Sequence, residues 1–171
     1  SITVLSADSL AKSGDELDLS IVKHLVTLDP TLKAAVSTYG LKRVAKRLKE
    51  SLSEDDEASQ VIDTNPPKLL RLTQSELEEI AKEQLDESMT LVKRVLKMGK
   101  LRFMPIDTIE IRKWPIHELA NEVNFVVLVG GLSKLKSFKK RLKEIFNQAD
   151  FYQVENPQQT VAEGLTYGDV M

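Results

Sequence analysis

The pattern of apolar and polar positions predicts a strand, a tight turn and a helix in the last third of the chain. Residues 125–129 form an unbroken apolar run rich in β-branched side chains, which is typical of a strand buried on both faces. Gly130 and Gly131 follow, and from Ser133 apolar residues recur at helical spacing, at Leu135, Phe138, Leu142, Ile145 and Phe146. A two-glycine turn allows a ligand to approach the backbone, although many such turns need glycine for steric reasons alone.

The first third of the chain predicts one strand and two helices. Residues 2–7 alternate between apolar and polar positions, as a half-buried strand does. A turn at residues 12–15 leads into a helix that ends at residues 29–30, where proline prevents its continuation. Residues 31–52 predict a second helix, interrupted near residues 39–40.

The middle of the chain predicts a hairpin and a long helix. Residues 58–62 and 68–72 read as strands, joined by a turn that contains two prolines. Thr73 and Glu76 have the spacing of a capping box, and helical periodicity continues from there to Gly99.

The remaining segments have weaker patterns. Two prolines exclude one long helix over residues 102–123, and the isoleucines at 106–111 favour a strand or hairpin. Near the end of the chain, residues 152–154 predict a strand and residues 160–166 a helix.

Composition narrows the possible classes of protein. The 171 residues are 42% hydrophobic and 29% charged, which is ordinary for a globular protein. A net charge of −2 indicates neither a nucleic-acid partner nor a membrane anchor, and no apolar run approaches the ~20 residues of a membrane span. Cysteine is absent, which fits a reducing cytosol. Because the chain opens on an apparent strand without methionine, we expect an excised fragment.

A basic stripe runs along the second predicted helix. Its members, Lys42, Lys46, Lys49 and Ser53, are spaced by four, three and four residues. The stripe has two interpretations: an ordinary solvated face, or a surface that faces a nucleotide or another polyanion. His24 and His117 lack partners at ligand spacing, so we expect no metal site.

Several segments, in order along the chain, resemble signatures of one family. These segments are residues 13–18, 45–53, 72–78 and 127–134, the last followed by 156–158 and 161–164. They resemble signatures of the nucleotide-binding domain of the seventy-kilodalton heat-shock chaperones (DnaK type), within the actin-like ATPase superfamily.

The resemblance implies the second lobe of that domain. Its fold would be α/β: an actin-like ATPase (ribonuclease H-like) lobe with a central mixed sheet flanked by helices. Residues 1–28 and 123–171 would form a discontinuous, sheet-based core subdomain, and residues 29–122 an inserted α+β subdomain. The connection over 102–123 is longer than the family's usual link.

The resemblance also implies a site for ATP or ADP. Lys49 and Ser53 would face the adenosine, Gly14 would line the same cleft, and the backbone of Gly130 and Gly131 would lie against ribose and phosphate. The full set of positions implied is Gly14, Lys46, Lys49, Glu50, Ser53, Gly130, Gly131, Leu132, Lys134 and Gln158.

Five of these positions depart from the family's pattern. Lys46 replaces a glutamate, Glu50 an arginine, Leu132 a serine, Lys134 an arginine and Gln158 an aspartate. A planar guanidinium stacks on a base, whereas an ammonium does not. Several lost contacts of about 1 kcal/mol each would weaken binding by tens- to thousands-fold.

The groups that would hydrolyse ATP are not found in this sequence. Phosphoryl transfer needs phosphate-binding loops, Mg²⁺ and a group that positions water, which in the family come from the first lobe and from a hairpin upstream of Ser1. We therefore expect no catalytic residues and no ATPase activity from this chain alone, although its full-length parent would be an ATPase with Mg²⁺ held by the other lobe.

Three functional hypotheses follow. The first is a fragment of a divergent cytoplasmic stress-response chaperone, whose full-length form would engage a nucleotide exchange factor, a J-domain co-chaperone and unfolded polypeptide. The second is an actin-like structural or scaffold protein with weakened or lost nucleotide binding. The third is an interaction module that keeps only the fold.

Overall fold

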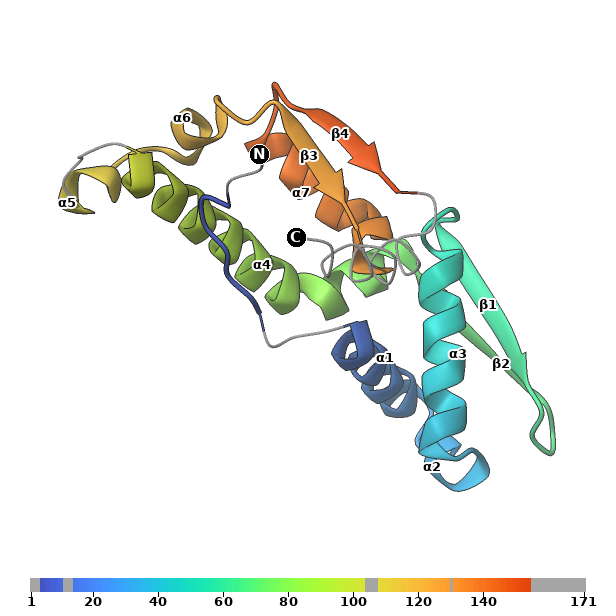
Figure 1. Ribbon diagram of the computed structural model, residues 1–171. Coiled ribbons are helices and arrows are strands. Elements are labelled where there is room, and N and C mark those ends of the chain that lie inside the picture. Colours follow the sequence, from blue (N-terminus) through green and yellow to red (C-terminus); the bar gives the residue numbers. More distant parts are fainter. Residues whose placement is uncertain (1–3, 11–13, 104–107, 130, 155–171) are drawn as a thin grey trace, which may run out of the picture. The chain divides into compact units, whose positions relative to one another are not determined.

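The computed structural model describes residues 4–10, 14–103, 108–129 and 131–154 (Figure 1). The chain divides into two compact units, one of residues 12–85 and one of residues 1–11 with 86–171. We call them the 12–85 unit and the 86–171 unit. The elements are α1 (Gly14–Leu28), α2 (Leu32–Ala35), α3 (Thr38–Ser51), β1 (Glu57–Ile62), β2 (Lys68–Thr73), α4 (Gln74–Phe103), α5 (Thr108–Ile111), α6 (Ile116–Ala120), β3 (Phe125–Leu128), a 3₁₀ turn at Gly131–Lys134, α7 (Lys136–Ile145) and β4 (Asp150–Gln153).

The 12–85 unit packs α1 and α3 against each other and against the β1–β2 hairpin (Figure 1). The two strands are antiparallel, with Ala58 opposite Leu72. Leu17, Ile21 and Leu48 from the helices are fully buried, as is Leu72 from the hairpin. Both predicted strands and the α1 helix are thus confirmed, and α1 ends before Pro30 as expected.

The second predicted helix is interrupted, but three residues earlier than expected. Val36 is extended, and Ser37 begins α3 by accepting a hydrogen bond from Gly40 N–H at 3.1 Å. The serine cap explains the position of the break, because it satisfies a free amide of the new helix. Tyr39 and Gly40, where the break was predicted, lie in the first turn of α3.

The predicted capping box at the start of α4 is confirmed. Glu76 accepts from the backbone N–H and the hydroxyl of Thr73, both at 2.8 Å, and the Thr73 hydroxyl accepts from Glu76 N–H at 3.2 Å. The helix continues to Phe103, four residues beyond the predicted end. Gly99 does not end it, because an isolated glycine inside a helix costs only about 1 kcal/mol.

The 86–171 unit contains a parallel pair of strands, β3 and β4, with α7 packed beside them (Figure 1). Phe125 lies opposite Asp150 and Leu128 opposite Gln153. The buried core of this unit combines residues of α4, α6, β3 and α7: Met89, Ala120, Leu128, Leu142, Ile145 and Phe146. The predicted strand–turn–helix and the strand near residue 152 are therefore present.

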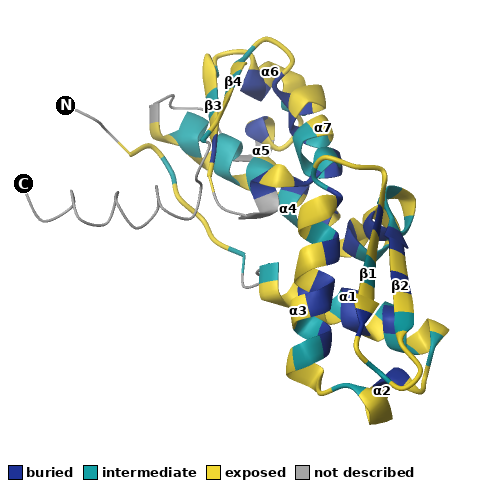
Figure 2. Cartoon of the chain, turned by 90° about the vertical axis from the view of Figure 1, so that its right-hand side faces the viewer, coloured by how far each residue is buried: buried dark blue, intermediate teal, exposed yellow. Residues whose placement is uncertain are grey.

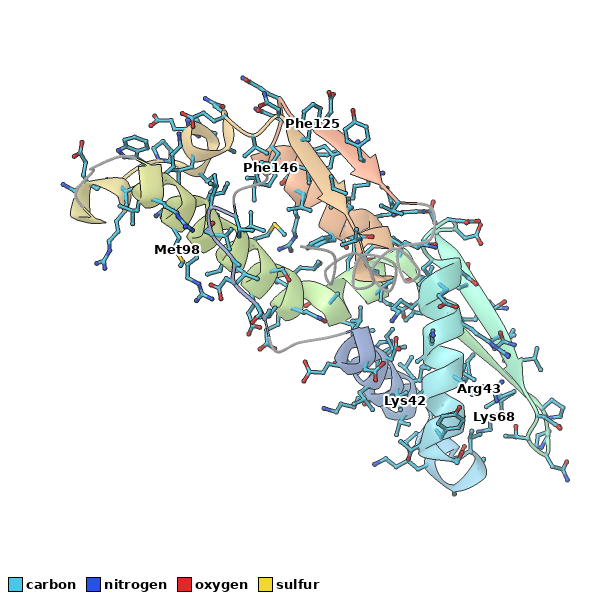
Figure 3. All side chains as sticks on the ribbon, viewed as in Figure 1. Lys42, Arg43, Lys68, Met98, Phe125 and Phe146 are labelled. Atoms are coloured by element: carbon cyan, nitrogen blue, oxygen red, sulfur yellow. The ribbon has the colours of Figure 1, made fainter. Side chains whose placement is uncertain are left out.

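The prediction that residues 125–129 are buried on both faces is wrong. Phe125 and Val127 are each 60% exposed, whereas Leu128 is buried (Figures 2 and 3). The reason is the size of the sheet: it has two strands among the described residues, and the core lies on one face only. A continuous apolar run therefore does not by itself establish two-sided burial.

The predicted strand at residues 2–7 is not observed over residues 4–7, which have no regular secondary structure. This segment instead lies along α4. The Ser6 hydroxyl donates to Val95 O at 2.8 Å, and Arg102 donates to the carbonyl oxygens of Val4 and Leu5 at 2.8 and 3.3 Å. The Arg102 side chain of α4 therefore satisfies backbone carbonyl groups that a sheet would otherwise pair.

The strand or hairpin predicted at residues 106–111 is also wrong in its described part. Residues 108–111 form the helical turn α5, and Ile116–Ala120 forms α6. The segment is tied to α4 by Lys97, which donates to Arg112 O at 3.2 Å, and by a salt bridge between Lys100 and Glu122. Tertiary contacts have overridden the β-branched composition.

The architecture is mixed α/β, with two two-stranded sheets among the described residues. The predicted subdomain boundaries, after residues 28 and 122, differ from the two compact units, and the division of the units falls within α4. The two units are defined by packing contacts and do not test the predicted subdomains, so the subdomain assignment stays a prediction.

The predicted helix at 160–166 lies outside the described residues. Over the part of the chain that the structure describes, no helix is both long and apolar enough to cross a membrane.

Candidate functional site

The start of α1 meets the second half of α3 within the 12–85 unit. The ammonium of Lys49 donates to Gly14 O at 3.4 Å and forms a salt bridge with Asp18. The structure thus brings together Gly14 and Lys49, two of the predicted site residues, from segments 35 residues apart. The glycine is not needed for space, since a Cβ there would lie 3.7 Å from Lys49 Nζ, an ordinary contact.

The Lys49–Asp18 salt bridge is largely withdrawn from solvent. The side chain of Lys49 is 14% exposed and that of Asp18 is 6% exposed. Asp18 lies on the buried stripe of α1 with Leu17, Ile21 and Leu25. A carboxylate on that stripe needs a cationic partner, which Lys49 provides.

Every lysine of the basic stripe faces a carboxylate. Lys42, on α3 (Figure 3), lies 3.8 Å from Asp15. Lys46 lies 4.0 Å from Glu50, one helical turn further on. Together with Lys49 and Asp18, these pairs neutralise the stripe. The structure therefore does not present it as a strongly positive surface.

Glu50 and Ser53 complete the end of α3. The Ser53 hydroxyl donates to Glu50 O at 2.6 Å, so its oxygen retains the capacity to accept. Lys46 and Glu50 are more than half exposed. The end of the helix therefore offers an ammonium, a carboxylate and a hydroxyl at its surface.

The remaining predicted site residues belong to the 86–171 unit or lie outside the described residues. Gly131 and Lys134 fall in the 3₁₀ turn before α7, and Lys134 is exposed. Within this turn Ser133 is buried, and its carbonyl accepts from Gln153 Nε2 at 3.5 Å. Gly130 and Gln158 lie outside the described residues.

The predicted site residues of α1 and α3 offer hydrogen-bond donors and acceptors but no planar stacking group. Lys49 has three donors, of which Asp18 and Gly14 use two. The third donor of Lys49, the Ser53 oxygen and the Glu50 carboxylate are further polar groups of this part of α3. Among the predicted site residues of this unit, no aromatic ring or guanidinium offers a stacking plane for adenine.

Comparison with known proteins points to one class. No protein-family model matches the chain. The chain is similar to the Chaperone protein HscA homolog of Acinetobacter baylyi, with 29% identity over 163 residues that cover 91% of this chain and 22% of that protein. It therefore spans about a fifth of the length of the curated relative it matches. The similarity is weak, extends over most of the chain and supports a relationship to chaperones of the seventy-kilodalton heat-shock type.

Proposed function

We propose that this chain is the nucleotide-binding lobe of a divergent molecular chaperone of the seventy-kilodalton heat-shock type and that it binds ATP or ADP. The observation that carries the proposal is the contact of Lys49 with Gly14, which joins two segments that the resemblance assigns to one nucleotide site. The chain-wide similarity to a chaperone supports the same assignment.

In this proposal the α1–α3 site recognises the nucleoside. Lys49 and Ser53 would hydrogen-bond the ribose hydroxyls, while Lys46 and Glu50 border the base. In the 86–171 unit, the turn that begins with Gly130 and Gly131 would present backbone N–H groups to an anionic group, with Lys134 nearby in sequence. Leu132 and Gln158 remain in the proposed set from the resemblance alone.

The activity of the whole protein is part of the same proposal. Mg²⁺ and the hydrolytic groups would come from the other lobe, so this chain alone would not hydrolyse ATP. The full-length protein would be cytoplasmic and would engage unfolded polypeptide, a J-domain co-chaperone and a nucleotide exchange factor.

One observation favours an alternative. The basic stripe is internally neutralised, and Lys46 pairs with Glu50 at the position where a nucleotide-binding lobe would need free groups. A structural or interaction domain of the actin-like superfamily with lost nucleotide binding would show the same feature.

Calorimetric titration of the 171-residue chain with ADP, ATP and GTP distinguishes the two. We expect adenine nucleotides to bind and Ser53→Ala or Lys46→Ala to weaken that binding by about three- to tenfold, the contribution of one hydrogen bond. Lys33→Ala, an exposed position on α2, is the matched control and should change nothing. The absence of heat with millimolar ADP, from a chain whose circular dichroism shows it folded, would reject nucleotide binding and favour the alternative.

A further inference from the structure

Among the residues that the structure describes, no strand pairs with the outer edge of β2 in the hairpin of the 12–85 unit. Gln74 N–H donates to Asp56 O at 2.8 Å, and the register places these two residues directly opposite each other. Hydrogen-bonded and non-hydrogen-bonded pairs alternate along an antiparallel ladder. Leu69, Arg71 and Thr73 therefore belong to non-hydrogen-bonded pairs, and their backbone N–H and C=O groups point away from β1.

The capping box confirms this direction independently. Thr73 N–H reaches the Glu76 carboxylate, which lies outside the hairpin ladder. For Leu69 and Arg71, no hydrogen-bonding partner of the outward backbone groups is found within the described ranges. An edge with free donors and acceptors is a template for an additional strand.

A groove of about 530 Å³ runs beside this edge. Four consecutive residues, 68–71, line it. Because successive side chains of a strand point to opposite faces, a groove that touches all four reaches around the edge of β2, and Glu57 of β1 also lines it. Leu25 and Leu28 of α1 form the opposite wall.

Four leucines and six polar or charged residues line the groove. Leu28 is 64% exposed and Leu69 is 49% exposed. Lys68, on the strand beside the turn (Figure 3), forms a salt bridge with Asp29 and holds the pKa of that carboxyl below its usual range. Arg71 lies 3.9 Å from Glu57. These pairs neutralise four of the five charged side chains that line the groove, and the fifth, Glu76, accepts hydrogen bonds in the cap of α4.

We propose that the outer edge of β2 binds an extended segment of another protein as an added β-strand. The free groups of Leu69 and Arg71 complement a peptide backbone, since they repeat at the two-residue period of a strand. Aliphatic side chains at alternate positions of the bound segment would pack against the exposed Leu28. The volume suits a short segment and not a folded domain.

The test is amide hydrogen exchange of the 171-residue chain, read residue by residue by NMR. In the free protein, the amides of Leu69 and Arg71 exchange rapidly, while those of Leu70 and Leu72 are protected by the ladder. The probe is a capped peptide of sequence Lys-Val-Thr-Val-Thr-Lys, whose valines lie on one face when it is extended. At saturating peptide we expect the Leu69 and Arg71 amides to slow by about tenfold or more, as one new hydrogen bond each would produce.

Two N-methylated versions of the peptide provide the matched control on an unaltered protein. One carries methyl groups on the valine amides and the other on the threonine amides. Because N–H groups alternate in direction along a strand, one version should lose binding and the other should keep it. Equal behaviour of the two, or no protection at millimolar peptide, would overturn the proposal. Protection that appears without peptide and grows with protein concentration would also overturn it, because it would assign the edge to self-association.

A pair of proline variants tests the edge from the protein side. Leu69→Pro removes an outward donor and is compatible with an edge strand, whereas Val61→Pro makes the same change directly opposite on β1. We expect about tenfold weaker peptide binding for the first and less than about twofold for the second, provided that the Leu70 and Leu72 amides remain protected. Equal losses for both variants would contradict the assignment to β2.

Discussion

The ammonium of Lys49 is held by a carboxylate 31 residues away in the chain. Removing two charged groups from water is costly, and the mutual attraction of Lys49 and Asp18 offsets that cost only while both are present. The same contact directs Lys49 toward the carbonyl of Gly14. The salt bridge therefore fixes the position of the residue on which the proposed nucleoside contact depends.

Removing the charge of only one partner of the Lys49–Asp18 pair should strongly destabilise the 12–85 unit. We expect Asp18→Asn to lower the free energy of unfolding by about 3 kcal/mol, because Lys49 would be left with little solvent and no counter-charge. The double variant Asp18→Leu with Lys49→Met should recover most of that loss, since it leaves no unpaired charge. Urea unfolding followed by circular dichroism measures both.

The matched control for that experiment is Asp15→Asn. Asp15 forms a similar pair with Lys42 at 3.8 Å, but its side chain is 82% exposed. Exposed pairs contribute about 0–1 kcal/mol, so this variant should unfold close to the wild type. If Asp18→Asn cost no more than Asp15→Asn, burial of the pair would not be the source of its effect.

At the scale of elements, the capping box at the start of α4 should make the free energy of unfolding fall as the pH becomes acidic. Hydrogen bonds from the Thr73 backbone, and then from its hydroxyl, hold the pKa of Glu76 below its usual range, with a smaller contribution from His24 at 3.7 Å. A lowered folded-state pKa means that the stabilisation is complete above the ordinary glutamate pKa of about 4.3 and is lost as the pH falls through the folded value. Glu76→Gln should remove this part of the pH dependence, which thermal unfolding between about pH 2.5 and 6 would show.

The comparison for Glu76→Gln is Glu79→Gln. Glu79 is exposed on the same helix and lies outside the cap. It should retain the wild-type loss of stability at acidic pH. An equal change in the two variants would show that the acid response comes from general charge and not from the capping box.

Elements whose causes are local in sequence were predictable. The hairpin follows from alternating apolar residues around a proline turn, and the start of α4 follows from the spacing of Thr73 and Glu76. Segments whose conformation or burial depends on contacts with residues distant in sequence were not predictable. Residues 4–7 lie along α4 because Ser6 and its neighbours bond there, and Phe125 is exposed because the core covers one face of the sheet.

The candidate site, too, was predictable from the sequence only in part. The resemblance placed Gly14 and Lys49 in one site, and the structure brings them into contact. The carboxylate partners of Lys42 and Lys49 were missed, because pairings between helices leave no periodic trace in sequence. The turn at Gly131 was located correctly as the link between β3 and α7. Its proposed ligand remains untested.

At the scale of the whole molecule, each compact unit has a core of its own. In the 12–85 unit the fully buried residues include Leu17, Leu48 and Leu72, and in the 86–171 unit the buried cluster includes Leu142 and Phe146. Local stability in proteins follows such cooperative units. The two cores therefore need not unfold together.

Two large-to-small substitutions should separate the two cores. Leu48→Ala and Leu142→Ala each remove a buried side chain and should each cost about 3 kcal/mol locally. In native-state hydrogen exchange, Leu48→Ala should accelerate the amides of α3, β1 and β2 and leave those of β3, β4 and α7 near their wild-type rates. Leu142→Ala should produce the reverse pattern. Uniform acceleration of both sets by either variant would show one cooperative unit, because the continuous helix α4 would then couple the two cores into a single unfolding transition.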